Sequence, residues 1–223
     1  MRSNQLNSFI SDLIDIGLVF SNKPISEQRS GRITMVSVGQ SGKPTKNDYD
    51  ITDVVEDNLP EETSIREYTR LFENGFYSLL FHDGSLAQLS YSISNRNGDI
   101  IAYRYVYIPA VAEIDVSASE SPDIHLNNAD LSKLPRHPVL RFEFDPDGQA
   151  RRHPESHLHL SSNSTRIPVN AKMTPRCFIG LIIDYYYEGF IEAFHAKYPQ
   201  MAVAAGHLSQ DDEKRFHIAP YRI

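Results

Sequence analysis

The short segment SHLHL at 156–160 contains two histidines, which stand two positions apart. His157 and His159 alternate with Leu158 and Leu160. Side chains two apart on a strand point to one face of a sheet. The alternation therefore predicts a strand whose leucines face the core. Both imidazoles then share the opposite face, where they can exchange protons near neutral pH.

The preceding segment, LRFEF at 140–144, alternates in the same way. Its leucine and phenylalanines predict a side that faces the core, which leaves Arg141 and Glu143 on the other side. We expect the two strands to pair as a hairpin. One face of the sheet then presents Arg141, Glu143, both histidines and Ser161.

These residue types suit the cleavage of RNA by its own 2′-hydroxyl. One group takes the proton from that hydroxyl, another protonates the leaving oxygen, and imidazoles suit both roles. A guanidinium binds the phosphate with bidentate geometry. We therefore predict that His157, His159 and Glu143 are catalytic, with Glu143 as the base or as the residue that orients a histidine. Such a reaction needs no metal and no other cofactor. The predicted substrate-binding residues are Arg141, Arg152 and Ser161.

Two other interpretations of the same residues stay open. The two histidines could ligate zinc or another first-row metal together with a carboxylate such as Glu143 or Glu155. They could also line an exposed sheet face, or pair with acidic residues, and serve only the structure. A cluster of titratable groups indicates a functional site only as a matter of probability.

The rest of the sequence predicts the elements that position these strands. Apolar residues at the spacing of an amphipathic helix occur between residues 4 and 20, and an apolar, helical stretch runs from Thr174 to Tyr198. Period-2 alternation runs along 89–94 and 101–107, on either side of the hairpin signal Asn97–Gly98.

A β-branched run at 32–38 predicts a further strand, and a capping box at Ser64 and Glu67 predicts a short helix. This order of elements favours an α+β fold: a mostly antiparallel sheet with a flanking N-terminal helix and a long C-terminal helix. The acidic stretch at 111–135 predicts a loop insertion. We expect a single domain that spans residues 1–223.

The composition limits the classes of protein to which the chain can belong. Its 223 residues are 40% hydrophobic and 23% charged, which is ordinary for a folded domain. The net charge of −7 argues against a dedicated duplex DNA binder, which carries a basic face. With Cys177 as the single cysteine, we expect neither a disulfide within the chain nor a cysteine zinc site. Asp12 and Asp15 interrupt the first apolar run, so we expect no signal peptide, no membrane span and a cytoplasmic location.

Two stretches carry a resemblance to known families: LSYSISNRNGDIIAYRYVYIPA at 89–110 and LRFEFDPDGQARRHPESHLHLS at 140–161. As a whole, the chain looks like an uncharacterised bacterial family of small proteins, a resemblance that implies no activity. The middle third also resembles the TumE-like toxins of toxin–antitoxin modules, which show a strand with a tyrosine, a glycine turn, an arginine strand and an H-x-H strand. The resemblance implies that Arg141, His157 and His159 are the matching positions. The chain departs from those toxins by a long insertion and by helices at both ends.

Two functions from different classes follow. The first is a toxin or phage-defence component that acts on RNA as a ribonuclease or phosphoryl-transfer enzyme, with a cognate antitoxin as partner. The second is a non-enzymatic binding or regulatory subunit of a bacterial defence complex, with a protein partner. Neither involves a membrane. The first requires His157, His159 and Arg141 to be exposed and convergent in one cleft. The second predicts that they are scattered or buried, with an apolar exposed patch elsewhere.

Overall fold

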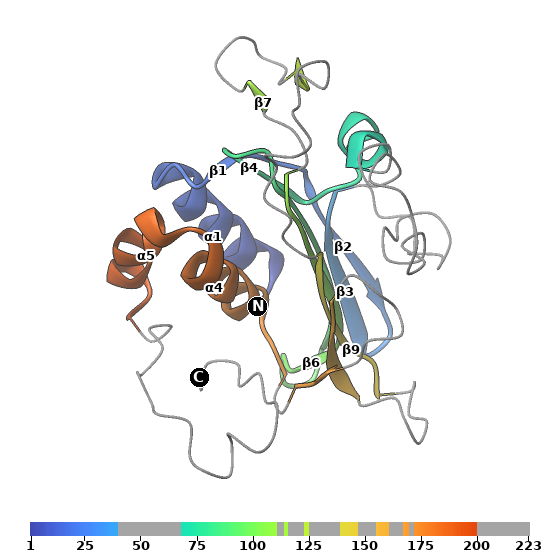
Figure 1. The fold of residues 1–223 in the computed structure, drawn as a ribbon. Helices are drawn as coiled ribbons and strands as arrows, with labels where there is room; N and C mark the ends of the chain where they lie inside the picture. Colours follow the sequence, from blue (N-terminus) through green and yellow to red (C-terminus); the bar gives the residue numbers. More distant parts are fainter. Residues whose placement is uncertain are drawn as a thin grey trace.

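The structure, a computed structural model, describes residues 1–39, 68–110, 114–115, 123–124, 139–146, 155–160, 167–169 and 172–199. These residues form the α+β fold that the order of elements predicts. A sheet of nine strands has helices on both of its faces (Figure 1).

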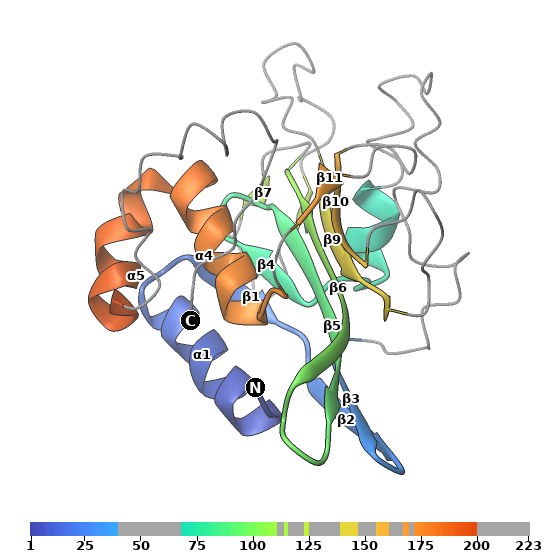
Figure 2. The same ribbon diagram turned by 90° about the horizontal axis from the view of Figure 1, so that it is seen from below.

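Every pairing in this sheet is antiparallel. The main path runs through β1 (Val19–Asn22), β4 (Leu79–Phe81), β5 (Leu86–Ser94), β6 (Ile100–Ile108), β9 (Leu140–Phe144), β10 (Ser156–Leu160) and β11 (Ile167–Pro168). A second branch leaves β5, because β3 (Ile33–Val38) pairs with β5 and β2 (Ile25–Ser30) pairs with β3. Figure 2 shows β5, β6, β9 and β10 side by side, with β11 at the edge.

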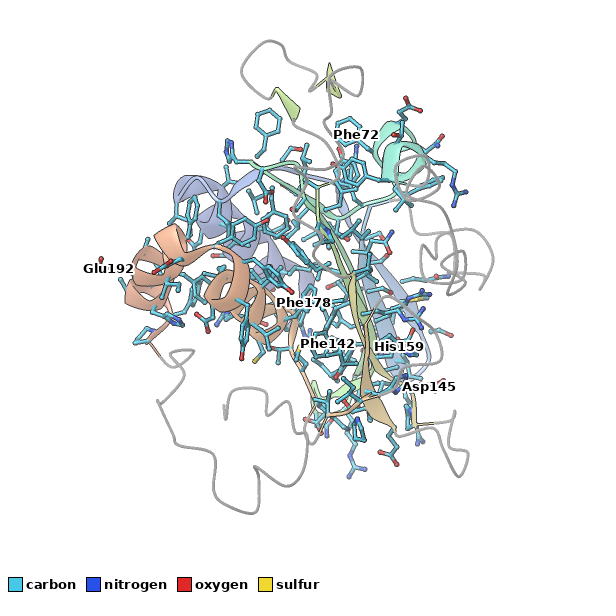
Figure 3. The ribbon with its side chains drawn as sticks, viewed as in Figure 1. Phe72, Phe142, Asp145, His159, Phe178 and Glu192 are labelled. Carbon is cyan, nitrogen blue, oxygen red and sulfur yellow. The ribbon has the colours of Figure 1, made fainter. Side chains whose placement is uncertain are left out.

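Two long helices, α1 (Ser3–Asp15) and α4 (Pro175–Tyr186), cover one face of the sheet (Figure 1). The apolar stripe of α1 is buried as its spacing predicts, with Leu6 and Phe9 fully inaccessible. Phe142 of β9 contacts Phe178 of α4 with ring centroids 6.0 Å apart. Figure 3 shows both phenylalanines on the helical side of the sheet. This layer holds the main hydrophobic core.

The opposite face is covered only in part by the helical turns at 68–73. Tyr68 and Leu71 from this segment form a second buried cluster with Val106 and Ile108 of β6. The next side chain of β6 on this face is that of Arg104, which is polar. The site described below lies on that polar part of the face.

The β5–β6 hairpin forms at the predicted Asn97–Gly98 turn, where Gly98 has a φ of 78° that favours glycine. The alternation on β6 differs from the prediction at one end. The register shifts between Ser92 and Ile93, so Ile93 pairs with Ile100. Ile100, and not Ile101, therefore joins the core. A bulge of this kind inserts a residue that no period-2 pattern can reveal.

The N-terminal helix forms in the predicted region. It ends at Asp15. Gly17, with a φ of 77°, then turns the chain, and Val19 begins β1. The strand at 25–30 was not predicted, because its exposed, charged residues lack the alternation of a half-buried strand. It pairs with the correctly predicted strand β3.

The long C-terminal helix is interrupted. Thr174 caps α4 by accepting a hydrogen bond from the backbone N–H of Cys177, and Pro175 occupies the first turn. The helix stops at Tyr187, whose hydroxyl donates to Asp83 of the β4–β5 turn at 3.0 Å. A short 3-10 turn, η3 (Glu188–Phe190), then leads into α5 (Ile191–Lys197). The prediction of one helix was wrong: Tyr187 leaves the helical conformation, with φ −131° and ψ 56°.

Several predictions concern residues outside the described ranges. Most of the predicted insertion at 111–135 is among them; within it, β7 (Ile114–Asp115) and β8 (Asp123–Ile124) form a short antiparallel ladder. Ser64 and Glu67 also lie outside. None of the helices in the described part of the chain combines the length and the apolar character that crossing a membrane requires.

Candidate functional site

The histidine strand and the arginine–glutamate strand pair as predicted. In the β9–β10 ladder His157 stands opposite Glu143, and His159 stands opposite Arg141. Because the intervening Phe142 faces the helices, these four side chains lie on the other face. Figure 3 shows His159 on the side of the sheet away from Phe142.

A fifth side chain joins them from the neighbouring strand. In the β6–β9 ladder, Arg104 stands opposite Glu143. This arginine was not among the predicted site residues. Its place was implicit in the alternation of Tyr103 and Tyr105, which leaves Arg104 on the opposite face. The missing information was which strand lies beside β9. Below, the Glu143 cluster means Arg104, Arg141, Glu143, His157 and His159.

The carboxylate of Glu143 is the centre of this cluster. Its Oε1 lies 3.4 Å from Nε of Arg141 and 3.6 Å from Nε of Arg104. Its Oε2 lies 3.3 Å from Nε2 of His157 and 3.5 Å from Nε2 of His159. Two guanidinium groups and two imidazoles thus face one carboxylate.

The cluster is convergent but mostly buried. His157, His159 and Arg141 are 0%, 1% and 4% exposed. The side chains of Glu143 and Arg104 keep 23% and 20% of their surface exposed. The first functional hypothesis expected convergence, which is found, and exposure of the histidines, which is not. Within the cluster, solvent therefore reaches mainly the side chains of Glu143 and Arg104.

The environment of Glu143 holds its pKa well below the usual range of a glutamate. Burial by itself raises this pKa, because it penalises the charged form. Hydrogen bonding from His157 and His159 and the positive charges of Arg141 and Arg104 outweigh that effect. A carboxylate this acidic is a poor proton acceptor at neutral pH. Of the two roles considered for Glu143, its environment favours orienting the histidines.

Three residues of the cluster could also ligate a metal ion. Glu143, His157 and His159 each offer one ligand atom, and these three atoms lie within 4.8 Å of one another. The other carboxylate considered from the sequence, Glu155, is exposed and is not part of this group. Arg152 and Ser161, the remaining predicted substrate-binding residues, lie outside the described residues.

Comparison with protein families assigns the chain a family. The family model DUF2290, described as an uncharacterized conserved protein, matches residues 21–220. The chain belongs to the DUF2290 family. The match includes all five residues of the Glu143 cluster and confirms the expected membership of an uncharacterised family. No curated protein and no solved structure matches the chain. The likeness to TumE-like toxins therefore stays a prediction.

Proposed function

We propose that this DUF2290 protein is a cytoplasmic bacterial toxin or phage-defence component that cleaves RNA without a metal. The observation that supports this proposal is the convergence of two imidazoles and two guanidiniums on one carboxylate. The H-x-H and arginine strands that resemble those of TumE-like toxins support the toxin role. A cognate antitoxin or another defence protein is then the expected partner.

The proposed reaction is an attack of the ribose 2′-oxygen on the adjacent phosphorus. One imidazole of the pair His157 and His159 accepts the proton of the 2′-hydroxyl as the new P–O bond forms. The other imidazole donates a proton to the 5′-oxygen as its bond to phosphorus breaks. The products are a 2′,3′-cyclic phosphate and a free 5′-hydroxyl. Each of the two proton transfers typically contributes about 10²–10⁴-fold to the rate of such a step.

The remaining cluster residues have supporting roles in this proposal. Arg104 and Arg141 bind the phosphate, since guanidinium groups match phosphate oxygens in a planar fork. Glu143 positions both imidazoles from one oxygen. The substrate approaches along Glu143 and Arg104, whose side chains provide the exposed part of the cluster.

The decisive experiment uses the purified full-length chain on a labelled RNA and on DNA of the same sequence, in the presence of EDTA. The proposal requires RNA to be cleaved to a cyclic phosphate and the DNA to stay intact, because DNA has no 2′-hydroxyl. His157→Gln and His159→Gln should each lower the rate by about 10²–10⁴-fold. His82→Gln, at an exposed turn position, is the matched control. Cleavage of both nucleic acids, or equal rates in all variants, would refute this mechanism.

Expression of the chain in a bacterial host tests the biological role. We expect growth arrest with wild type and relief of the arrest by Arg104→Gln, which removes one charge from a partly exposed position. Arg96→Gln removes the same charge from the exposed β5–β6 turn and should still arrest growth. Arrest by both variants would place the toxic activity elsewhere in the molecule.

A second candidate function has an observation in its favour. The near-complete burial of His157, His159 and Arg141 supports a non-enzymatic binding or regulatory subunit of a defence complex, in which the cluster maintains the fold. This candidate predicts a folded chain that cleaves no RNA and that co-purifies with a protein from its native host. Recovery of the chain alone, together with RNA cleavage, would exclude it.

A further inference from the structure

We propose that His157, His159 and Glu143 form a binding site for one divalent first-row transition ion such as Zn²⁺, and that this ion inhibits the RNA cleavage proposed above. The inhibition rests on the proposed function, whereas the binding does not. The ion would occupy the Nε2 atoms through which Glu143 orients both imidazoles, and so would displace the contact that the proposed cleavage relies on. Metal binding and acid–base chemistry at this site therefore exclude each other.

The distances between the ligand atoms support the site. Zinc lies about 2.0–2.2 Å from nitrogen and oxygen ligands. In a tetrahedral arrangement such ligand atoms lie about 3.3–3.6 Å from one another by simple geometry. Oε2 of Glu143 lies 3.3 Å and 3.5 Å from Nε2 of His157 and His159. Both carboxylate–imidazole distances thus match the spacing of a metal's ligand set, and all three ligand atoms lie within 4.8 Å of one another.

The backbone fixes these ligands in place. His157 and His159 extend from the same face of β10, and Glu143 extends from the directly paired position on β9. Both strands lie inside the sheet, with β6 on one side and β11 on the other. Ligands on paired strands are held more precisely than ligands on loops. Little rearrangement is needed when the ion binds.

Burial suits an ion better than it suits a large substrate. The two imidazoles have 0% and 1% exposure, so a polynucleotide reaches them only after the site opens. A single ion is small enough to enter beside Glu143, which keeps 23% of its side-chain surface exposed. The same burial that limits access of RNA protects a bound ion from exchange with solvent.

The arginines determine which ions fit. Arg141 and Arg104 contact Oε1 of Glu143 and leave Oε2 directed at the histidines. An outer contact of this kind commonly orients a ligating carboxylate. Their positive charge also opposes any cation, so binding depends on strong bonds to imidazole nitrogen. We therefore expect Zn²⁺, Co²⁺, Ni²⁺ and Cu²⁺ to bind, and Mg²⁺ and Ca²⁺, which prefer oxygen ligands, not to bind.

Binding is tested by titrating the EDTA-treated, dialysed full-length chain with Co²⁺ and following the visible absorption of the protein-bound ion. Isothermal titration with Zn²⁺ then gives the affinity. We expect one equivalent to bind the cluster. His157→Gln and Glu143→Gln, checked for folding by circular dichroism, should weaken binding by more than the roughly 10–100-fold typical of an outer-shell change. His82→Gln should bind as wild type does.

Arg104→Gln separates ligation from a general collapse of the cluster. Arg104 is not a ligand, so this variant should weaken Zn²⁺ binding by no more than the roughly 10–100-fold of an outer-shell change, and far less than His157→Gln does. Absence of Co²⁺ and Zn²⁺ binding to folded wild type would overturn the metal site and leave the proposed RNA cleavage untouched. Binding that persists in His157→Gln would also overturn it, as would equal loss in Arg104→Gln and His157→Gln. RNA cleavage that requires Zn²⁺ would overturn both the inhibition and the metal-independent mechanism.

Discussion

Glu143→Gln tests the central claim about the site, that one carboxylate holds two guanidiniums and two imidazoles together. The substitution keeps the shape of the side chain and removes its charge. Arg141 is buried, at 4% exposure, and keeps its own positive charge. The substitution removes the negative charge of Glu143 beside it. We expect a large loss of stability and no change in the secondary structure.

The size of the effect follows from the burial of the partners. Removing one member of a buried ion pair costs about 3–5 kcal/mol of unfolding free energy. Glu143 keeps 23% of its side-chain surface exposed, which favours the lower end of that range. For a protein of this length, about 3 kcal/mol corresponds to a melting temperature lower by roughly 6–12 °C. Asp12→Asn is the comparison variant. Its charged partner Lys197 is 41% exposed, so the ion pair is worth at most about 1 kcal/mol, and the amide oxygen of asparagine can still accept from the Tyr198 hydroxyl.

The assay is urea unfolding of wild type and Glu143→Gln at a series of pH values. The folded-state pKa of Glu143 lies below the value of 4.5 for a free glutamate side chain. Its contribution is therefore complete above that value and declines as pH falls below it, by at most about 1.4 kcal/mol per pH unit. The two proteins should differ most near neutral pH and converge in acid. A difference below about 1 kcal/mol at pH 7 would place Glu143 among ordinary surface pairs and refute the argument.

Substitutions at three further residues test the packing that positions the site. Each is measured by urea unfolding, with circular dichroism as the signal. Thr174→Ala should cost about 1 kcal/mol, since it removes the cap of α4, while Thr174→Ser should stay close to wild type. Phe142→Ala should cost about 3–5 kcal/mol because the ring is fully buried against Phe178; a loss below 1 kcal/mol would mean that the helix is not seated on this strand. Arg176→Gln should cost about 1 kcal/mol, since the guanidinium lies 4.6 Å from the ring centroid of Tyr198, and Arg176→Lys should recover part of that loss.

Local patterns in the sequence determined the faces of the strands. The alternation of Leu158 with its histidine neighbours, and of Phe142 with Arg141 and Glu143, was enough to place four cluster residues on one face. The hairpin pairing of the two strands followed from their closeness in the chain. These features depend on residues near one another in sequence, so periodicity carries the information.

Contacts between distant segments were decided only by the tertiary structure. The sequence holds no local signal that β6 lies beside β9, so Arg104 was missed, although its face was implicit in its own strand. At the break after α4, the hydroxyl of Tyr187 donates a hydrogen bond to Asp83, a residue far away in the sequence. Burial of the histidines likewise depends on the whole fold, because an alternating strand has the same pattern whether its polar face is open or covered. The sequence alone therefore determined which residues meet on the β9–β10 hairpin. The tertiary structure decided the burial of the histidines, the contact of Arg104 with Glu143 and the lowered pKa of that carboxyl.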